Sequence, residues 1–139
     1  MRNIVVLDAC ALIAYIKDEE GADIVADVID DAEAGRVVLL INRINLLEIY
    51  YDLYRSKGEA YARNIMHNIM AFDIRLVEFT EEIFFEAGRF KASYKMSLAD
   101  SIAIATAEIK GGELLTADHH EFDPIEAAGT ENIRFHWIR

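Results

Sequence analysis

The sequence predicts an α/β fold in which a parallel sheet of about five strands is covered by helices on both faces. Short runs rich in β-branched residues alternate with longer segments of helical periodicity, the order typical of such folds. The runs do not alternate between apolar and polar residues, as expected of strands buried on both faces. With 139 residues, 53% of them hydrophobic, and one proline, the chain is expected to form a single domain over residues 1–139.

The expected strands are the short apolar runs. The first, Ile-Val-Val-Leu, is continuous and β-branched, and it stops at Asp8. The five runs cover residues 3–7, 37–41, 75–79, 113–116 and 133–138.

The expected helices follow from caps, stops and apolar spacing. Asn42 and Thr80 are favourable N-cap residues, and Gly35, Gly58 and Gly111 are favourable residues for ending a helix. The predicted helices cover residues 9–17, 23–34, 43–56, 59–70, 80–94 and 97–109. Residues 118–128 are expected to form a loop or a short helix.

Charge and cysteine content limit the function classes. A net charge of −11 repels nucleic acid at long range, so contact with a phosphate chain must depend on a local site. The single cysteine, Cys10, excludes an internal disulfide and a cysteine-rich zinc site, which fits the cytoplasm. Asp8 interrupts the only run that resembles a signal peptide, and no stretch approaches the ~20 apolar residues that span a bilayer. We therefore expect a cytoplasmic protein without a membrane role.

Four carboxylates lie inside or at the end of apolar segments that contain no lysine or arginine. They are Asp8, Glu48, Asp100 and Asp118. An unpaired polar group in such surroundings costs about 2 to 7 kcal/mol, and an unpaired charge costs more. In a parallel α/β fold, all four can meet beyond the carboxyl ends of the strands. Carboxylate oxygens favour Mg²⁺ or Mn²⁺, so the pattern predicts a divalent cation site.

Each acid also has a structural explanation when taken alone. Asp8 can cap a helix, and Asp100 occupies the last position of a capping box that begins at Ser97. Asp118 can close a turn, whereas Glu48 is harder to explain and gains a structural partner only if Arg43, Arg55 or Lys57 reaches it. The metal hypothesis therefore depends on their convergence.

Four motifs, in order along nearly the whole chain, resemble the PIN-domain proteins of the VapC-like toxin ribonuclease family. They are Ile-Val-Val-Leu-Asp8-Ala-Cys-Ala-Leu-Ile-Ala, Ile-Asn-Leu-Leu-Glu48-Ile-Tyr, Ser97-Leu-Ala-Asp100-Ser-Ile-Ala and Leu-Leu-Thr116-Ala-Asp118-His-His-Glu-Phe122. The resemblance implies a three-layer α/β/α PIN-like domain and a Mg²⁺- or Mn²⁺-dependent endoribonuclease. Such an enzyme cleaves single-stranded or loop RNA by metal-activated water.

The resemblance also implies partners and roles. It implies a small antitoxin protein, a toxin-antitoxin pair and a homodimer. The four acids match the catalytic and metal-binding quartet of the family, and Thr116 matches a supporting hydroxyl residue. Asp123 is a candidate fifth carboxylate, and Arg43 is a candidate for holding a substrate phosphate. The family commonly has serine or threonine where Ala9 and Cys10 stand, so a hydroxyl beside the metal is missing.

Two other functions remain open. A catalytically weak PIN-like module could bind a basic antitoxin segment, RNA or a structural ion without cleavage. An aspartyl phosphotransferase of the haloacid-dehalogenase type fits poorly, because its second aspartate would stand where Cys10 is. A tyrosine stripe, Tyr50, Tyr51, Tyr54 and Tyr61, is a candidate dimer interface.

Overall fold

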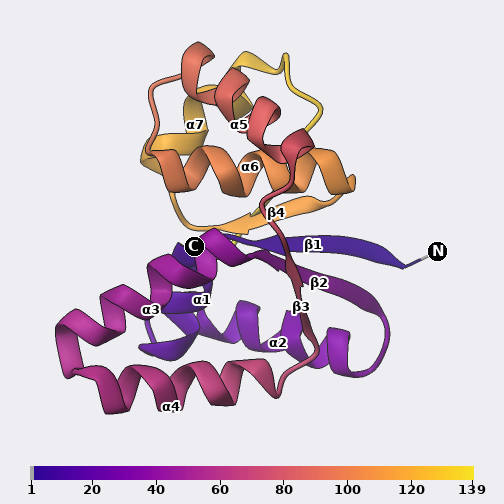
Figure 1. Ribbon diagram of the computed structural model, residues 1–139. Helices are drawn as coiled ribbons and strands as arrows, with labels where there is room; N and C mark the ends of the chain where they lie inside the picture. Colours follow the sequence, from indigo (N-terminus) through magenta and orange to yellow (C-terminus); the bar gives the residue numbers. More distant parts are fainter. Residues whose placement is uncertain (1) are drawn as a thin grey trace.

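The computed structural model describes residues 2–139, whose centre is one parallel sheet of five strands (Figure 1). The strand order is β3-β2-β1-β4-β5. The strands are β1 (Asn3–Leu7), β2 (Val37–Asn42), β3 (Ile74–Val77), β4 (Glu113–Thr116) and β5 (Phe135–Trp137). The predicted parallel sheet of about five strands is confirmed.

Helices cover both faces of this sheet. They are α1 (Ala9–Ile16), α2 (Ala22–Glu33), α3 (Arg43–Lys57), α4 (Glu59–Met70), α5 (Glu81–Ser93), α6 (Leu98–Lys110) and α7 (His119–Ala128). The first four lie on one face and the last three on the other (Figure 1). Each layer has its own apolar core, and the sheet contributes alternate residues to the two, such as Leu7 to one and Val6 to the other. The result is the predicted three-layer α/β/α architecture.

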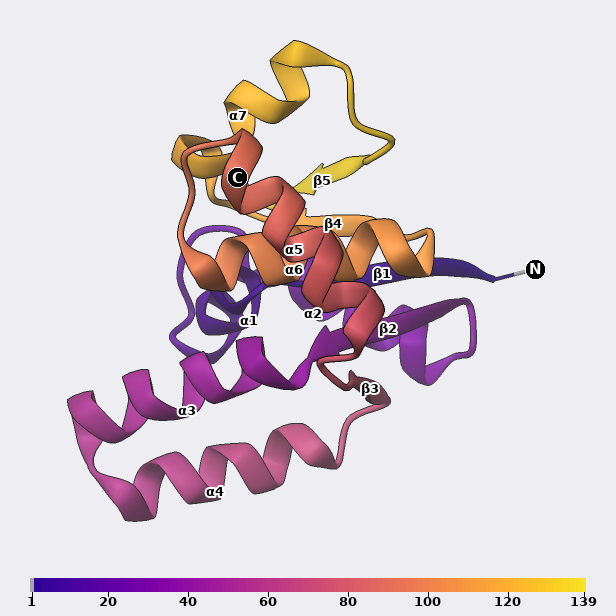
Figure 2. The ribbon, with the colours of Figure 1, turned by 45° about the horizontal axis from the view of Figure 1, so that its top comes forward.

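Helices α3 and α4 form a hairpin that extends beyond the sheet (Figure 2). Gly58 joins them with a φ of +89°, a left-handed conformation that favours glycine. Leu53 and Ala62 bury the inner face of the hairpin, whereas Tyr51 and Tyr54 are exposed on the outside. Two of the tyrosines in the predicted interface are therefore free of the core.

Helix α6 is buried along its middle and runs beside the sheet. Its residues from Ser101 to Ala107 are all buried, and most are small, so the helix packs closely on β1, β2 and β4. Thr106 accepts a hydrogen bond from the buried amide of Asn42 at 3.1 Å. The position directly after Gly111, residue 112, requires glycine, because a Cβ atom there would lie 2.8 Å from the side chain of Ile4. These contacts hold α6 against the sheet, and Asp100 lies in the first turn of this helix.

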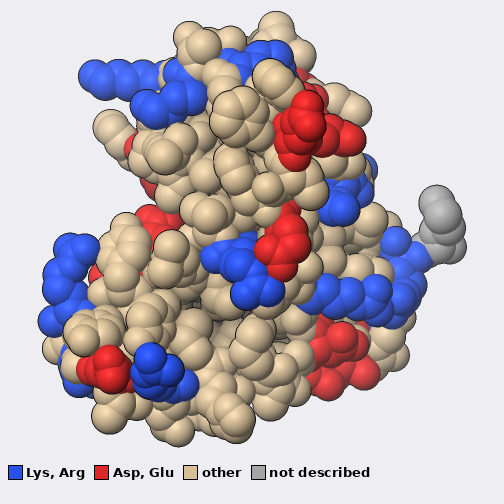
Figure 3. Space-filling model, viewed as in Figure 1, with Lys and Arg blue, Asp and Glu red and all other residues tan. Residues whose placement is uncertain are grey.

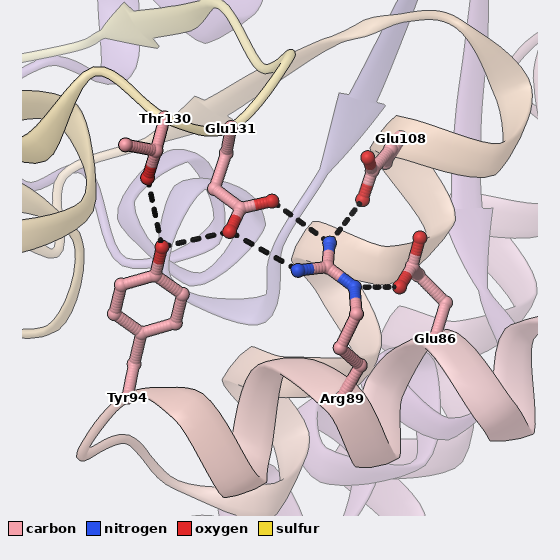
Figure 4. A network of polar contacts seen from close by, with 6 residues as sticks. All are labelled: Glu86, Arg89, Tyr94, Glu108, Thr130 and Glu131. Carbon is pink, nitrogen blue, oxygen red and sulfur yellow. Dashed lines mark hydrogen bonds and ion pairs between the residues drawn. The ribbon is translucent and has the colours of Figure 1, made fainter.

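A network of charged side chains connects the C-terminal segment to helices α5 and α6 (Figure 4). The guanidinium of Arg89 on α5 contacts Glu86, Glu108 on α6, and Glu131 in the loop before β5. Tyr94 also donates to Glu131 at 2.7 Å. Hydrogen bonds to Glu131 and Glu86 raise the pKa of Arg89, so it stays charged. The network holds the loop that returns the chain to β5.

Among residues 2–139, no helix combines the length and apolar character needed to cross a bilayer.

Candidate metal centre

The site forms where the strand order reverses. β1 pairs with β2 on one side and with β4 on the other, so loops leaving β1 and β4 diverge at the carboxyl edge of the sheet. The backbone N–H of Asp8 donates to the carbonyl of Leu115 at 3.4 Å and continues the pairing beyond β1. Asp8 and Asp118 each follow a strand, as the sequence predicted, and the structure shows that these two strands are neighbours.

Asp8 is almost fully buried, with 1% of its surface exposed. One carboxylate oxygen accepts the N–H of Ala11 at 2.8 Å and caps α1, and the other accepts the hydroxyl of Thr116. Burial raises the pKa of Asp8 to about 7, although both hydrogen bonds oppose the shift. The structural explanation as a helix cap is correct, but it leaves the charge without a cation.

Asp118 connects the acids to one another. Its side chain caps α7 by accepting the N–H of Glu121 at 3.3 Å, and its own N–H donates to the hydroxyl of Thr116 at 3.0 Å. Its negative charge contributes to the raised pKa values of Asp8, Glu48 and Asp100. Thr116 thus links Asp8 to Asp118, which supports its predicted role beside the site.

Asp100 lies in the first turn of α6, where Ser97 caps the helix by accepting the N–H of Asp100 at 3.1 Å. Burial raises the pKa of Asp100 to about 8, and the charges of Asp118 and Asp8 add to the effect. Within the described residues, no backbone N–H bonds to its carboxylate in return, so the capping box is only half formed. The side chain remains available to a cation.

Glu48 lies in the second turn of α3 and is partly exposed. Burial is the main cause of its raised pKa, and the negative charges of Asp52 and Asp118 raise the pKa further. The amide of Asn45, one turn earlier, donates to the carbonyl of Ala99 at 3.0 Å and holds this end of α3 against the start of α6. Within residues 2–139, the buried Oδ1 of Asn45 has no donor, so it can accept from a water molecule.

The tightest acidic cluster combines Asp100 and Asp118 with Glu121, whose carboxylate oxygens lie within 4.8 Å of one another. Asp8 and Glu48 lie outside this group of three but interact with it electrostatically. The described lysines and arginines make their ion pairs elsewhere and none with these five acids. Hard oxygen donors, raised pKa values and missing counter-charges fit a divalent cation.

Glu121 was missing from the sequence prediction. The signal was its place three residues after Asp118, which brings the two side chains together once α7 begins at His119. The sequence of residues 118–128 did not favour helix over loop, so the three-residue spacing did not define where the two side chains lie. Helix α7 supplies it.

The two further candidates have other partners. Arg43 forms a two-pronged contact with Glu78, with N–O distances of 2.8 and 2.9 Å, at the surface. Asp123 is bonded to the Nδ1 atom of His119 at 2.8 Å. Neither side chain belongs to the cluster of three acids.

Cys10 lies in the first turn of α1 and is partly buried. Burial raises its pKa to about 11, and the nearby charge of Asp8 adds to the shift. The thiol is therefore protonated at neutral pH and is a poor nucleophile. This agrees with the expectation that Cys10 is not a nucleophile, although the side chain is only partly buried.

The fold is shared with solved structures of low sequence identity. The DNA-bound VapBC complex of Salmonella typhimurium matches with a TM-score of 0.75 and 15% identity over 100% of both chains. VapBC2 of Rickettsia felis, bound to a promoter DNA fragment, gives 0.71 and 15% over 96% of this chain and 97% of that one. Mycobacterium tuberculosis VapC20, described as a sarcin-ricin loop cleaving toxin, gives 0.64 and 17% over 94% and 98%. The comparison with curated proteins finds no match.

The family comparison is decisive. The PIN domain model matches residues 5–127, a stretch that holds all five acids of the site and most of the sheet. The predicted resemblance is confirmed, and the chain belongs to the PIN domain family.

Proposed function

We propose that this protein is a Mg²⁺- or Mn²⁺-dependent endoribonuclease that cleaves single-stranded or loop RNA. We also propose that it acts in the cytoplasm as the toxin of a toxin-antitoxin pair. The observation that carries the proposal is the cluster of Asp100, Asp118 and Glu121 in a PIN-family chain, in which none of the three acids forms an ion pair with a lysine or arginine of residues 2–139. VapC20, which has the same fold, is described as cleaving the sarcin-ricin loop, and this supports RNA as the substrate class.

The acids have complementary roles in this proposal. Asp100, Asp118 and Glu121 would hold the ion, and Asp8 and Glu48 complete the negative site around it. When bound, a divalent ion supplies Lewis acidity at the phosphate and makes water more acidic. Thr116 keeps Asp8 and Asp118 in register through its two hydrogen bonds.

Hydrolysis adds water across one phosphodiester P–O bond and leaves a phosphate on one fragment and a hydroxyl on the other. Glu48 is partly exposed and lies outside the group of three, and its pKa is raised. We therefore assign to it the acceptance of the proton from the attacking water.

The test is an RNA cleavage assay with Mg²⁺, Mn²⁺ or EDTA. Asp8→Asn and Asp100→Asn should abolish cleavage, whereas Asp30→Asn, the same chemical change at an exposed position of α2, should leave it intact. The mechanism is wrong if no RNA is cut, if EDTA has no effect, or if the two site variants remain fully active.

An alternative is a catalytically weak module that uses the acids to bind a basic segment of an antitoxin. The observation that favours it is the same unpaired acidic cluster, together with Cys10 in place of a hydroxyl residue. The neighbours from Salmonella typhimurium and Rickettsia felis are VapBC complexes, which supports a small protein partner in either case. Calorimetry with a basic peptide separates the two functions, because tight metal-independent binding without RNA cleavage would favour the alternative.

We also propose a homodimer, for which two surfaces compete. One is the tyrosine stripe, of which Tyr51 and Tyr54 are 45% and 46% exposed. The other is an apolar groove of about 760 Å³ on α5 and α6, where Phe84 and Phe85 are 55% and 65% exposed. In the second surface the exposed apolar side chains are adjacent to one another, whereas apolar residues on an ordinary surface are scattered singly.

Light scattering of the variants Phe85→Glu and Tyr54→Glu tests the two surfaces. If the groove is the interface, Phe85→Glu gives monomers and Tyr54→Glu leaves the dimer mass unchanged. The opposite pattern would assign the tyrosine stripe, and a monomeric wild-type protein would contradict the proposal.

A further inference from the structure

Two of the five acids of the site, Glu48 and Glu121, line two separate grooves that share Ser97, the cap of α6. A groove of about 350 Å³ contains Glu48 and is otherwise lined by uncharged residues, among them Leu47, Tyr51 and Leu98. The second groove, of about 540 Å³, contains Glu121 and is lined by Lys91, Lys95 and His120. The site therefore has one uncharged approach and one basic approach.

The basic approach is unusual in a chain with a net charge of −11. Within residues 2–139, neither Lys91 nor Lys95 pairs with a carboxylate, whereas Lys17, Arg43 and Arg89 do. Figure 3 shows basic side chains at its upper left, where Figure 1 places the end of α5 and the loop that leads to α6. The two lysines lie in this part of the chain.

The groove is held in shape by its own contacts. Lys91 donates to the carbonyl of Met96 at 2.7 Å, which ties the loop after α5 back onto that helix. The next residue, Ser97, caps α6 beside Asp100, and His120 stands on the first turn of α7 beside Glu121. Lys95 is exposed and lies between these fixed points.

We propose that this basic groove, defined by Lys91, Lys95 and His120, holds the phosphates of the RNA strand next to the bond that is cleaved. The inference deepens the proposed function and rests on it, because it names the direction from which the strand reaches the acids. Repulsion by the whole chain is overcome locally, since the lysines replace counterions on the phosphates. The uncharged groove is left for a base or for the far end of the strand.

Recognition in the basic groove is independent of base sequence. Phosphate contacts position a strand but do not read it, so Lys95 sets affinity and register while leaving base preference unchanged. An acidic peptide could also pair with the lysines. RNA is favoured because Glu121, one of the three clustered acids, lines the same groove as the lysines, so a strand held there lies beside the site proposed to cleave it.

The experiment measures binding and cleavage separately. Anisotropy of a short fluorescein-labelled single-stranded RNA is followed against salt concentration in Ca²⁺, which takes the same oxygen ligands. We expect Lys95→Ala to weaken binding by roughly two- to fivefold. We also expect it to reduce the slope of log affinity against log salt by about 0.7. Lys110→Ala, at the far end of α6, is the matched control and should change neither quantity.

The cleavage assay with Mg²⁺ adds a second readout. Lys95→Glu should raise KM for RNA with little change in kcat, while cleavage positions stay the same. If wild-type protein cleaves RNA but Lys95→Ala and Lys110→Ala bind it equally, the groove proposal fails and the proposed function stands. If no RNA is cleaved but binding depends on Lys95, the groove still binds RNA phosphates, whereas the nuclease assignment fails and with it the place of the groove next to a cleaved bond. Binding of polyglutamate through Lys95, with no RNA binding, would overturn the groove's assignment to RNA.

Discussion

Thr116 is the residue on which the geometry of the acids depends most directly. Its buried hydroxyl donates to Asp8 and accepts the N–H of Asp118. We expect Thr116→Val to destabilise the fold by about 1 to 3 kcal/mol, because the N–H of Asp118 loses its partner. Metal affinity should fall by about tenfold, as it does when groups that orient ligands are removed. Urea unfolding and calorimetry with Mn²⁺ measure the two effects.

Thr116→Ser is the control for this prediction, because it keeps the hydroxyl and loses only a methyl group. It should restore most of the metal affinity. Equal loss of affinity in the serine and valine variants would show that the methyl contact, rather than the hydrogen bonds, supports the site.

Asp8 gives a pH dependence of stability in the metal-free protein. Its pKa is about 7 in the fold against 3.8 for the free side chain, so the folded protein keeps a proton that the unfolded chain has lost. The stabilisation is complete below about pH 4 and disappears as pH rises through 7. Between about pH 5.5 and pH 7.5 in EDTA, Asp8 should contribute a decrease of about 2 kcal/mol in the free energy of unfolding.

The comparison of wild type with Asp8→Asn isolates this effect, since the other titrating groups are common to both. The variant should show a pH dependence that is shallower by that amount, and the exposed variant Asp30→Asn should follow the wild type. Parallel curves for wild type and Asp8→Asn would mean that Asp8 is charged throughout the range.

At the residue level, the sequence predicted which acids lie at the carboxyl edge of the sheet but not which lie closest together. Asp8 and Asp118 were readable because they follow apolar strands, and both do cap helices. Glu121 was not predicted, because the sequence around it did not favour helix over loop. The partners of Arg43 and Asp123 are distant or local polar contacts that no spacing pattern encodes.

At the level of elements, the sequence was most informative where periodicity was long or a cap was clear. α4 and β1 begin and end where expected, because Gly58 and Asp8 mark the boundaries. β5 is limited to Phe135–Trp137, shorter than the predicted run of residues 133–138, since only these three residues are in register with residues of β4. Strand order could not be predicted, because it is set by which surfaces pack after the strands form.

The anchoring of the C-terminal loop by α5 gives a prediction for an element. Arg89 contacts three glutamates on three segments, and the side chain of Glu131 is only 10% exposed. We expect Arg89→Met to reduce the free energy of unfolding by about 1 to 2 kcal/mol, below the cost of a fully buried pair because Arg89 is 43% exposed. Urea unfolding measures the loss.

Arg63→Met is the matched control, because Arg63 forms a single exposed pair with Glu59 within α4. It should change stability little. Hydrogen exchange should also show faster exchange around Thr130 and Glu131 in Arg89→Met only. An equal and small effect of both substitutions would show that the network adds nothing beyond isolated surface pairs.

At the scale of the whole molecule, the net charge of −11 and the acids without ion-pair partners both lower the stability of the folded state. Salt screens repulsion between exposed charges, but it screens the buried acids much less. A bound divalent ion acts on the buried acids directly. The metal-free protein is therefore expected to gain stability from NaCl and to gain more from a divalent ion at equal ionic strength.

The size of the metal effect should depend on pH, because the acids must lose their protons before they bind an ion. The pKa values of Asp8 and Asp100 are raised to about 7 and about 8, so metal affinity should rise steeply between about pH 6 and pH 8. Thermal unfolding with Mn²⁺ should show a larger increase in Tm at the higher pH. Asp100→Asn should lose most of that increase, and NaCl at matched ionic strength should not reproduce it. An increase in Tm that is the same at both pH values, or that survives in Asp100→Asn, would place the ion elsewhere on this acidic chain.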